Sequence, residues 1–181
     1  MNRFRRLRQN QAIRRLVQET EISPKDLIYP IFVIEGENIK EPVESMPGVY
    51  RYSIDKIDEI LEEVSKSGIS GILLFGVPAH KDSVGSEAYN ENGVTQRAIR
   101  YIKAKYPNML VIADICLCEY TSHGHCGLIS GNEILNDETL PLLAKAALTN
   151  VQAGADMVAP SDMMDGDVAA IKKILEDNGF I

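Results

Sequence analysis

The sequence predicts an α/β fold of the (β/α)8 TIM-barrel type, with about the first four β/α units of the barrel preceded by an N-terminal arm. Continuous apolar runs of strand length alternate with amphipathic helical stretches, a pattern typical of parallel sheets covered by helices. The four runs begin roughly 40 residues apart, as repeats of one unit would. No G-x-G-x-x-G or P-loop motif follows any of them, so an open doubly wound nucleotide-binding sheet loses its main support.

The predicted strands are DLIYPIFVI at 26–34, GISGILLFG at 68–76, MLVIADICL at 109–117 and DMVAPS at 156–161. Because Pro30 has no backbone N–H to donate, the first strand is expected to be irregular or at a sheet edge. A loop rich in glycine and proline follows it. Phe180 and Ile181 resemble the start of a further strand.

The predicted helices cover 54–67, 93–105, 138–152 and 165–177. In the first, isoleucine, leucine and valine recur at the spacing of a helix that buries one face. Ser53 is expected to cap its N-terminus, and Gly68 to end it. A narrower apolar stripe of Ala12, Ile13, Leu16 and Val17 predicts a short helix in the arm.

We divide the chain into an arm, residues 1–23, which serves oligomerisation, and an N-terminal half-barrel, residues 24–181. Residues 1–25 carry seven basic and two acidic side chains, a net charge of +5, whereas the whole chain carries −7. The rest of the chain therefore carries −12. A basic arm beside an acidic body suits a neighbouring subunit better than nucleic acid, so we expect a homo-oligomer and no nucleic-acid partner.

The composition, 45% hydrophobic and 25% charged, is that of an ordinary globular protein. No apolar run reaches the roughly 18 residues of a membrane span. The basic N-terminus lacks the apolar stretch of a secretory signal. We therefore expect a cytoplasmic protein with no membrane partner.

All three cysteines lie within eleven residues of each other, which favours a metal or reactive site over a disulfide framework. Asp114, Cys116 and Cys118 alternate along the end of a predicted strand, so their side chains are expected to share one face. In a parallel barrel this face is the interior at the carboxyl end, where active sites lie. Cys126 returns after a loop that contains glycine.

Three converging thiolates suit Zn²⁺. With Cys116, Cys118 and Cys126 as the only ligands, one coordination position stays open for water or substrate, which is the catalytic arrangement. His123 or His125 could instead complete a closed structural site. The spacing alone leaves both alternatives open.

The candidate catalytic residues are Asp114 and Ser161, each at the end of an apolar strand. Each also has a simpler interpretation. Asp114 could be a buried carboxylate satisfied by backbone amides. Ser161, or Asp162 with Asp165, could cap the next helix, and the pattern alone favours capping for Ser161.

The block DICLCEYTSHGHCG at 114–127 resembles porphobilinogen synthase, also called 5-aminolevulinate dehydratase. Further blocks resemble that family in the same order: RRLR, LIYPIFV, SMPGVYRYS, GILLFGVP, GSEAYNENG, QRAIRYIK and APSDMMDG. The resemblance thus covers nearly the whole chain. It implies a (β/α)8 barrel that condenses two 5-aminolevulinate molecules into porphobilinogen for haem and other tetrapyrroles.

The resemblance implies catalytic Zn²⁺ on Cys116, Cys118 and Cys126, and substrate contact by Asp114 and Ser161. Zinc there would act as a Lewis acid. The resemblance further implies an arm that wraps a neighbouring subunit, usually within a homo-octamer. An allosteric Mg²⁺ is carried over from the family alone.

The family reaction also depends on two Schiff-base lysines, which lie beyond the point matching Ile181. None of the ten lysines here matches their motifs. The chain thus looks truncated, and we expect the 181 residues alone to be inactive as a synthase. The alternative is a non-catalytic zinc-binding or subunit-interaction fragment. A zinc hydrolase on a partial barrel is a weaker hypothesis than these two, since no H-E-x-x-H or multi-histidine set is present.

Overall fold

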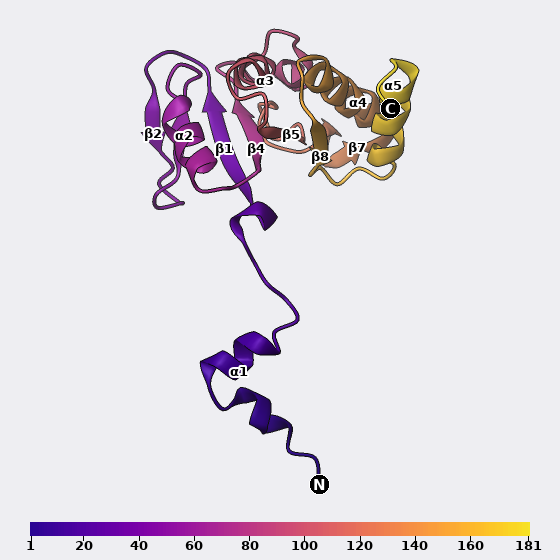
Figure 1. Cartoon of the computed structure of the whole chain (residues 1–181). Coiled ribbons are helices and arrows are strands. Elements are labelled where there is room, and N and C mark those ends of the chain that lie inside the picture. The colour runs from indigo at the N-terminus through magenta and orange to yellow at the C-terminus, as the bar shows by residue number, and fades with distance from the viewer.

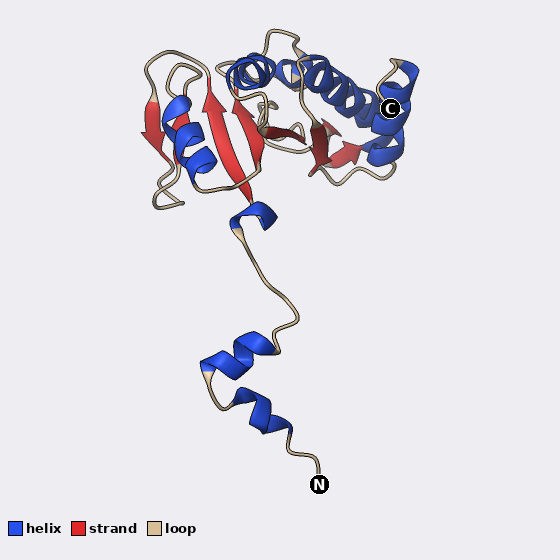
Figure 2. Ribbon diagram, in the orientation of Figure 1, coloured by secondary structure: helices blue, strands red, loops and turns tan.

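A computed structural model describes residues 1–181 and contains one main sheet covered by helices, with an extended N-terminal arm (Figures 1 and 2). The six strands of the main sheet are β1 (Ile28–Ile34), β2 (Lys40–Pro42), β3 (Tyr50–Tyr52), β4 (Gly71–Val77), β5 (Leu110–Ile115) and β8 (Met157–Pro160). A separate hairpin consists of β6 (Leu128–Ser130) and β7 (Glu133–Leu135). The α-helices are α1 (Gln11–Leu16), α2 (Asp58–Lys66), α3 (Val94–Lys105), α4 (Asn136–Gln152) and α5 (Asp167–Asp177). Short 3-10 helices are η1 (Phe4–Arg8), η2 (Pro24–Asp26) and η3 (Ser86–Tyr89).

The order of the strands matches a barrel rather than a doubly wound sheet. β1, β4, β5 and β8 lie side by side in chain order, and each neighbouring pair is parallel. A doubly wound sheet would reverse its strand order at a switch point. The four predicted strands and the four predicted body helices are therefore present in the predicted order.

Alternate residues of the parallel strands face two different environments. On β4, Ile72 and Leu74 are buried, whereas Leu73, Phe75 and Val77 are partly exposed. Because side chains alternate along a strand, the first pair points toward the helices and the other three toward the barrel interior. Phe75 stacks on Phe32 of β1 across this inner face, with ring centroids 5.2 Å apart.

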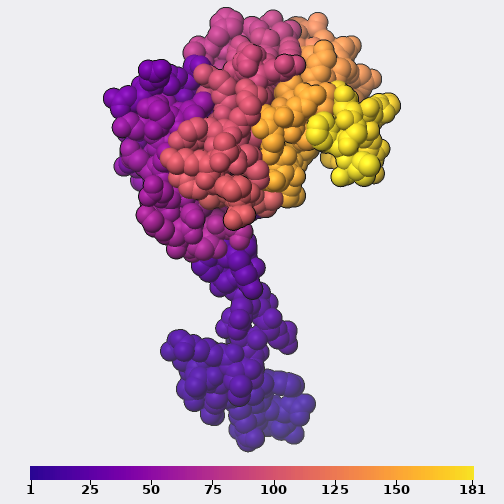
Figure 3. Space-filling view, turned by 45° about the horizontal axis from the view of Figure 1, so that its top comes forward, coloured from indigo at the N-terminus to yellow at the C-terminus, as the bar shows by residue number.

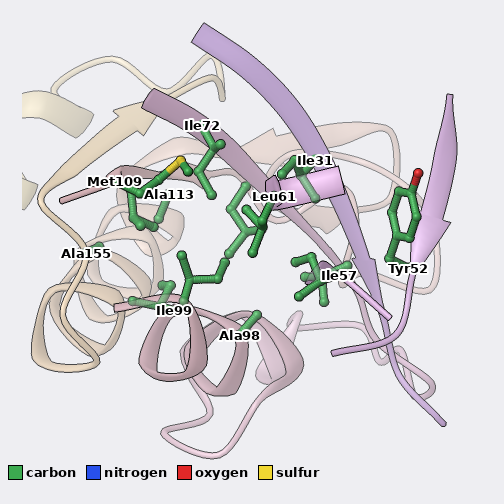
Figure 4. Packing of buried hydrophobic residues seen from close by; sticks show 14 of the residues in the cluster. Ile31, Tyr52, Ile57, Leu61, Ile72, Ala98, Ile99, Met109, Ala113 and Ala155 are labelled. Atoms are coloured by element: carbon green, nitrogen blue, oxygen red, sulfur yellow. The ribbon is translucent and has the colours of Figure 1, made fainter. Parts of the chain in front are cut away.

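The main core lies between the outer face of the sheet and helices α2 and α3 (Figure 4). Ile31 and Ile72 of the strands pack there with Leu61 of α2 and Ile99 of α3, all almost completely buried. A second cluster joins the residues after β5 to α4 and α5. Together the two clusters fix the strand ends against the helices that cover them.

Several sequence predictions about the body need correction. Ser53 does not cap α2, which begins at Asp58 with Ile57 as its N-cap. Instead, the buried Ser53 hydroxyl accepts a hydrogen bond from the Ile39 N–H at 2.8 Å, because the chain first turns once more at 54–57. Gly68 does follow the end of α2, with φ +78°.

Both short antiparallel pairs were missed. β2 and β3 have only three residues each and lie inside the predicted loop after β1. β6 and β7 are joined by a two-residue turn, Gly131-Asn132, which is a recognisable hairpin signal. Phe180 and Ile181 form no strand, since the Phe180 N–H donates to the Leu175 carbonyl just after α5.

The prediction for Pro30 fits the local geometry of β1. This strand lies inside the sheet, between β3 and β4. However, β3 pairs only with Phe32 and Val33, while Pro30 pairs with Leu73 of β4 alone. Pro30 thus lies on a stretch of β1 with one neighbouring strand, where its missing donor is tolerated.

The N-terminal arm extends away from the body and contains no buried residue (Figure 3). Its short helix α1 is capped by Asn10, whose side chain accepts a hydrogen bond from the Ile13 N–H. Several large apolar side chains are left exposed along it, including Phe4, Leu16 and Ile22. None of the helices combines the length and the apolar character that crossing a lipid bilayer requires.

Asp156, just before β8, ties three elements together. Its carboxylate accepts hydrogen bonds from Lys103 Nζ of α3 at 2.8 Å and from the Val111 N–H of β5 at 2.8 Å. Burial alone would raise the pKa of this carboxyl, but the hydrogen bonds from Lys103 and Val111 outweigh it and lower the pKa.

We expect Asp156→Asn to lower the free energy of unfolding by about 1 kcal/mol at neutral pH, a value reduced for partial exposure. A lowered folded-state pKa means that this contribution is present above the unfolded value of about 3.9 and is lost as the pH falls below it. Urea denaturation at several pH values measures the difference. The control is Asp177→Asn, which breaks only an exposed pair with Lys173 and should leave the midpoint unchanged. Equal effects of both variants would contradict the prediction.

Candidate metal centre

The carboxyl end of β5 carries Asp114, followed by Cys116 just past the strand. The predicted strand continued to residue 117, but β5 ends at Ile115 and Cys118 lies in a turn. The turn is closed by hydrogen bonds from the N–H groups of Tyr120 and Thr121 to the Leu117 carbonyl. The alternation of side chains along a strand therefore does not determine the position of Cys118. The turn nevertheless brings its sulfur next to that of Cys116.

The three cysteine sulfurs converge as expected. The Sγ atoms of Cys116 and Cys118 are 3.2 Å apart, and all three Sγ atoms lie within 4.8 Å of one another. Tetrahedral zinc with Zn–S bonds of about 2.3 Å holds its sulfurs about 3.8 Å apart. The Cys116–Cys118 pair is closer than this separation, and the three sulfurs lie near enough to one another to hold a metal ion.

The cysteines are free and partly enclosed, with Cys116 buried and the other two less so. A hydrogen bond to Cys118, together with burial, raises the pKa of the Cys116 thiol well above its usual value. Burial and the contact with Cys116 raise the pKa of the Cys126 thiol to about 11. A divalent metal would displace these protons, so binding is expected to release them.

Neither histidine of the loop belongs to the cluster, which contains only the three cysteines. His123 Nε2 lies 3.2 Å from the Ser83 carbonyl, and His123 Nδ1 accepts the N–H of His125. Both ring nitrogens of His123 are therefore engaged elsewhere.

Asp114 and Ser161 lie on adjacent strand ends beside the cysteines. β5 and β8 pair in register at Asp114 and Ala159, and the Ser161 N–H donates to the Ile115 carbonyl. The pKa of Asp114 is raised to about 6. Burial raises it most, a hydrogen bond with the Ser161 side chain lowers it in part, and the charges of Glu119 and Asp162 add to the rise. Asp114 is thus an almost fully buried acid rather than a solvated one.

The capping interpretation of Ser161 is wrong. α5 begins at Asp167, six residues later, and its N-cap Gly166 makes no side-chain capping bond. Asp162 Oδ1 accepts the Met164 N–H at 2.8 Å within a local turn. Ser161 is therefore exposed at the carboxyl end of β8, where its side chain bonds Asp114 instead of capping α5.

The structure adds residues that the sequence reasoning missed. Glu119 Oε2 lies 3.3 Å from Cys118 Sγ, so a carboxylate borders the sulfurs. Because Glu119 directly follows Cys118 in the sequence, its proximity to the sulfurs could have been predicted. The buried hydrogen bond between Tyr120 and Thr95, 2.8 Å long, joins the cysteine loop to α3. Nothing in the sequence pattern relates these two residues.

Comparisons with known proteins agree with this picture. The sequence model of the family "Delta-aminolevulinic acid dehydratase" matches residues 1–181. A relative of that name from Ruminiclostridium josui is 54% identical over 99% of this chain and 88% of its own length. Relatives of the same name from Halalkalibacterium halodurans and Bacillus subtilis are 56% and 50% identical, over 98% and 99% of this chain. The chain spans only 54% and 56% of their lengths, about half.

Among solved structures, the chain matches delta-aminolevulinic acid dehydratase (porphobilinogen synthase) from Toxoplasma gondii, determined in complex with the reaction product porphobilinogen. The match has a TM-score of 0.92 at 42% identity and covers 99% of this chain and 52% of that one. It confirms the predicted fold class. Sequence and structure agree over the whole of these residues: the chain belongs to the delta-aminolevulinic acid dehydratase family.

Proposed function

We propose that these residues form the metal-binding half of a porphobilinogen synthase, an enzyme that condenses two molecules of 5-aminolevulinate into porphobilinogen for tetrapyrrole synthesis. The observation that carries this proposal is the cluster of three thiols beside Asp114 and Ser161, at the carboxyl ends of parallel strands. In barrel enzymes this end of the strands holds the active site.

We propose Zn²⁺ as the metal, held by Cys116, Cys118 and Cys126. The sulfur-only donor set favours it over Mg²⁺, which prefers oxygen ligands, so a family Mg²⁺ would bind elsewhere. Bound at an open site, zinc supplies Lewis-acid polarisation of a carbonyl or hydroxyl oxygen. Three thiolates leave the cluster with excess negative charge, which favours a cationic partner such as the amino group of 5-aminolevulinate.

We assign substrate contact to Asp114 and Ser161. The carboxylate of Asp114 would order the substrate amino group or shuttle a proton at that nitrogen. The exposed hydroxyl of Ser161, on the neighbouring strand end, would hydrogen-bond a substrate oxygen. Phe75 and Phe32 line the same inner face further along the sheet and would keep water away from the reacting groups.

The arm, residues 1–23, is proposed to dock on a neighbouring subunit of a homo-oligomer, an octamer in the full-length family. Its exposed Phe4, Leu16 and Ile22 would find an apolar contact there, and its basic charge would face an acidic body. We propose a cytoplasmic enzyme, because three free thiols persist as metal ligands most readily in a reducing compartment.

A chimaeric enzyme tests the function. None of the ten lysines lies on β1, β4, β5 or β8, so the Schiff-base amines are expected from the remainder of the barrel. Residues 1–181 would replace the matching part of the Halalkalibacterium halodurans relative, with that unaltered relative assayed in parallel. We expect porphobilinogen to form from 5-aminolevulinate, and Cys126→Ser in the chimaera to reduce the rate at least about 100-fold.

The matched control is Ser122→Ala, on the same loop, whose side chain is exposed and makes no hydrogen bond. It should leave the rate unchanged. A folded, zinc-loaded chimaera that forms no porphobilinogen would contradict the proposed function and favour a non-catalytic zinc-binding fragment.

A further inference from the structure

The loop that carries the cysteines is anchored in the core by two adjacent side chains, Tyr120 and Thr121. Tyr120 lies two residues after Cys118 and six before Cys126, and it is 93% buried. It belongs to the cluster that packs β5 against α4 and α5. The neighbouring loop residues Ser122 and Gly124 are exposed. Of the two buried residues, Tyr120 is the one whose side chain reaches a helix, α3.

The Tyr120 hydroxyl makes one specific bond. It lies 2.8 Å from Thr95 Oγ1, and Thr95, the second residue of α3, is 1% exposed. Because both groups are buried, neither can replace this partner with water without cost. The bond thus fixes the loop relative to α3, an element that carries no metal ligand.

A glycine makes room for the pair. A Cβ at Gly76 of β4 would lie 2.5 Å from the Tyr120 hydroxyl oxygen and closer still to Thr95 Oγ1. Gly76 has an ordinary negative φ, so its backbone conformation does not require glycine. Glycine at position 76 instead leaves room for the hydroxyl groups of Tyr120 and Thr95.

Tyr120 also belongs to the turn that places a sulfur. Its N–H donates to the Leu117 carbonyl at 2.9 Å, and this bond closes the turn around Cys118. Leu117, between Cys116 and Cys118, is completely buried in the same cluster. A shift of the Tyr120 ring would therefore move Cys118 Sγ relative to Cys116 Sγ.

We propose that Tyr120, through its hydroxyl bond to Thr95 in the space left by Gly76, is a positioning residue of the metal site. It touches neither metal nor substrate in this role. It sets the separation of the sulfurs and so the affinity for the metal, as outer partners of metal ligands do in other sites. The inference rests on the proposed zinc site and adds a residue that determines its geometry.

Tyr120→Phe tests the proposal, because it removes the hydroxyl and keeps the buried ring. We expect the Kd of the 181-residue chain for Zn²⁺, measured by competition with a chromophoric chelator, to rise about 10-fold. The sulfur-to-metal charge-transfer absorption of the Co²⁺-loaded protein should also change. Thr95→Val removes the other hydroxyl of the bond and should raise the Kd for Zn²⁺ by the same factor. Thr95→Ser retains a hydroxyl and should bind Zn²⁺ as the wild type does.

Two comparisons separate positioning from general stability. Tyr101→Phe removes another hydroxyl bond of α3, to Asp58 Oδ2 at 2.7 Å, toward the far end of that helix. It should lower the unfolding midpoint of the metal-free chain without changing the Kd for Zn²⁺. The double variant Tyr120→Phe/Thr95→Val should bind Zn²⁺ no more weakly than either single variant, because both remove the same bond.

The outcomes distinguish the two proposals. An unchanged Kd and Co²⁺ spectrum in Tyr120→Phe, with zinc binding lost in Cys126→Ser, would overturn the positioning role and leave the metal site standing. Additive losses in the double variant would also overturn it. Should Tyr120→Phe fail to fold, the comparison of Thr95→Val with Thr95→Ser decides the question. Unchanged binding in Cys126→Ser would instead contradict the zinc site itself.

Discussion

Replacing Cys126 with serine is expected to weaken Zn²⁺ binding by at least about 100-fold, more than the 10- to 100-fold typical for loss of an outer partner. Cys126 supplies one of three sulfurs that lie within 4.8 Å of each other, and neither loop histidine belongs to this cluster. A serine hydroxyl is a much harder and weaker ligand for zinc than a thiolate. Competition titration of the purified chain at neutral pH measures the loss.

Ser122→Ala provides the control for this titration, since it alters the same loop without touching the sulfurs. It should retain one Zn²⁺ per chain with unchanged affinity. Equal stoichiometry and affinity in Cys126→Ser and the wild type would contradict the assignment of the ligands.

The largest effect on stability is expected at Leu117. This side chain is completely buried between β5 and α4, in one cluster with Ile115 and Leu143. Leu117→Ala should lower the free energy of unfolding by about 2–5 kcal/mol, because it removes buried methyl groups and leaves a cavity that the neighbours fill only in part. Urea denaturation of the metal-free chain, followed by circular dichroism, measures the change.

Leu16→Ala is the matched control, an identical substitution on the arm, where Leu16 is 85% exposed. Its free energy of unfolding should stay within about 0.5 kcal/mol of the wild type. A Leu117→Ala variant as stable as this control would show that the second cluster does not support the cysteine loop as described.

The sequence predicted the parallel strands well because each is a continuous apolar run. β1, β4 and β5 bury the side chains that face the helices, and β8 is partly covered. Their other side chains face the barrel interior, so few polar residues interrupt the four strands. β2 and β3 escaped prediction because three residues are too few to show a period. The β6–β7 hairpin could have been recognised from its Gly131-Asn132 turn.

The candidate site was predictable only as far as local geometry reaches. Strand alternation predicts a shared face for Asp114 and Cys116, but the meeting of Cys118 with Cys116 depends on a turn and on the packing of Leu117. The predicted capping by Ser161 failed because α5 starts later than its apolar period suggested. The contact of Tyr120 with Thr95 depends on tertiary structure, which no local pattern contains.

The central claim, that three cysteines and no other side chain hold the metal, is tested most directly by X-ray absorption at the zinc edge of the zinc-loaded chain. Cys116, Cys118 and Cys126 predict three sulfur neighbours at about 2.3 Å and one lighter oxygen or nitrogen neighbour from water or buffer. In the presence of 5-aminolevulinate the sulfur count should stay at three, because substrate can replace only the fourth ligand. A first shell with fewer than three sulfurs, or with imidazole scattering from His123 or His125, would contradict the account.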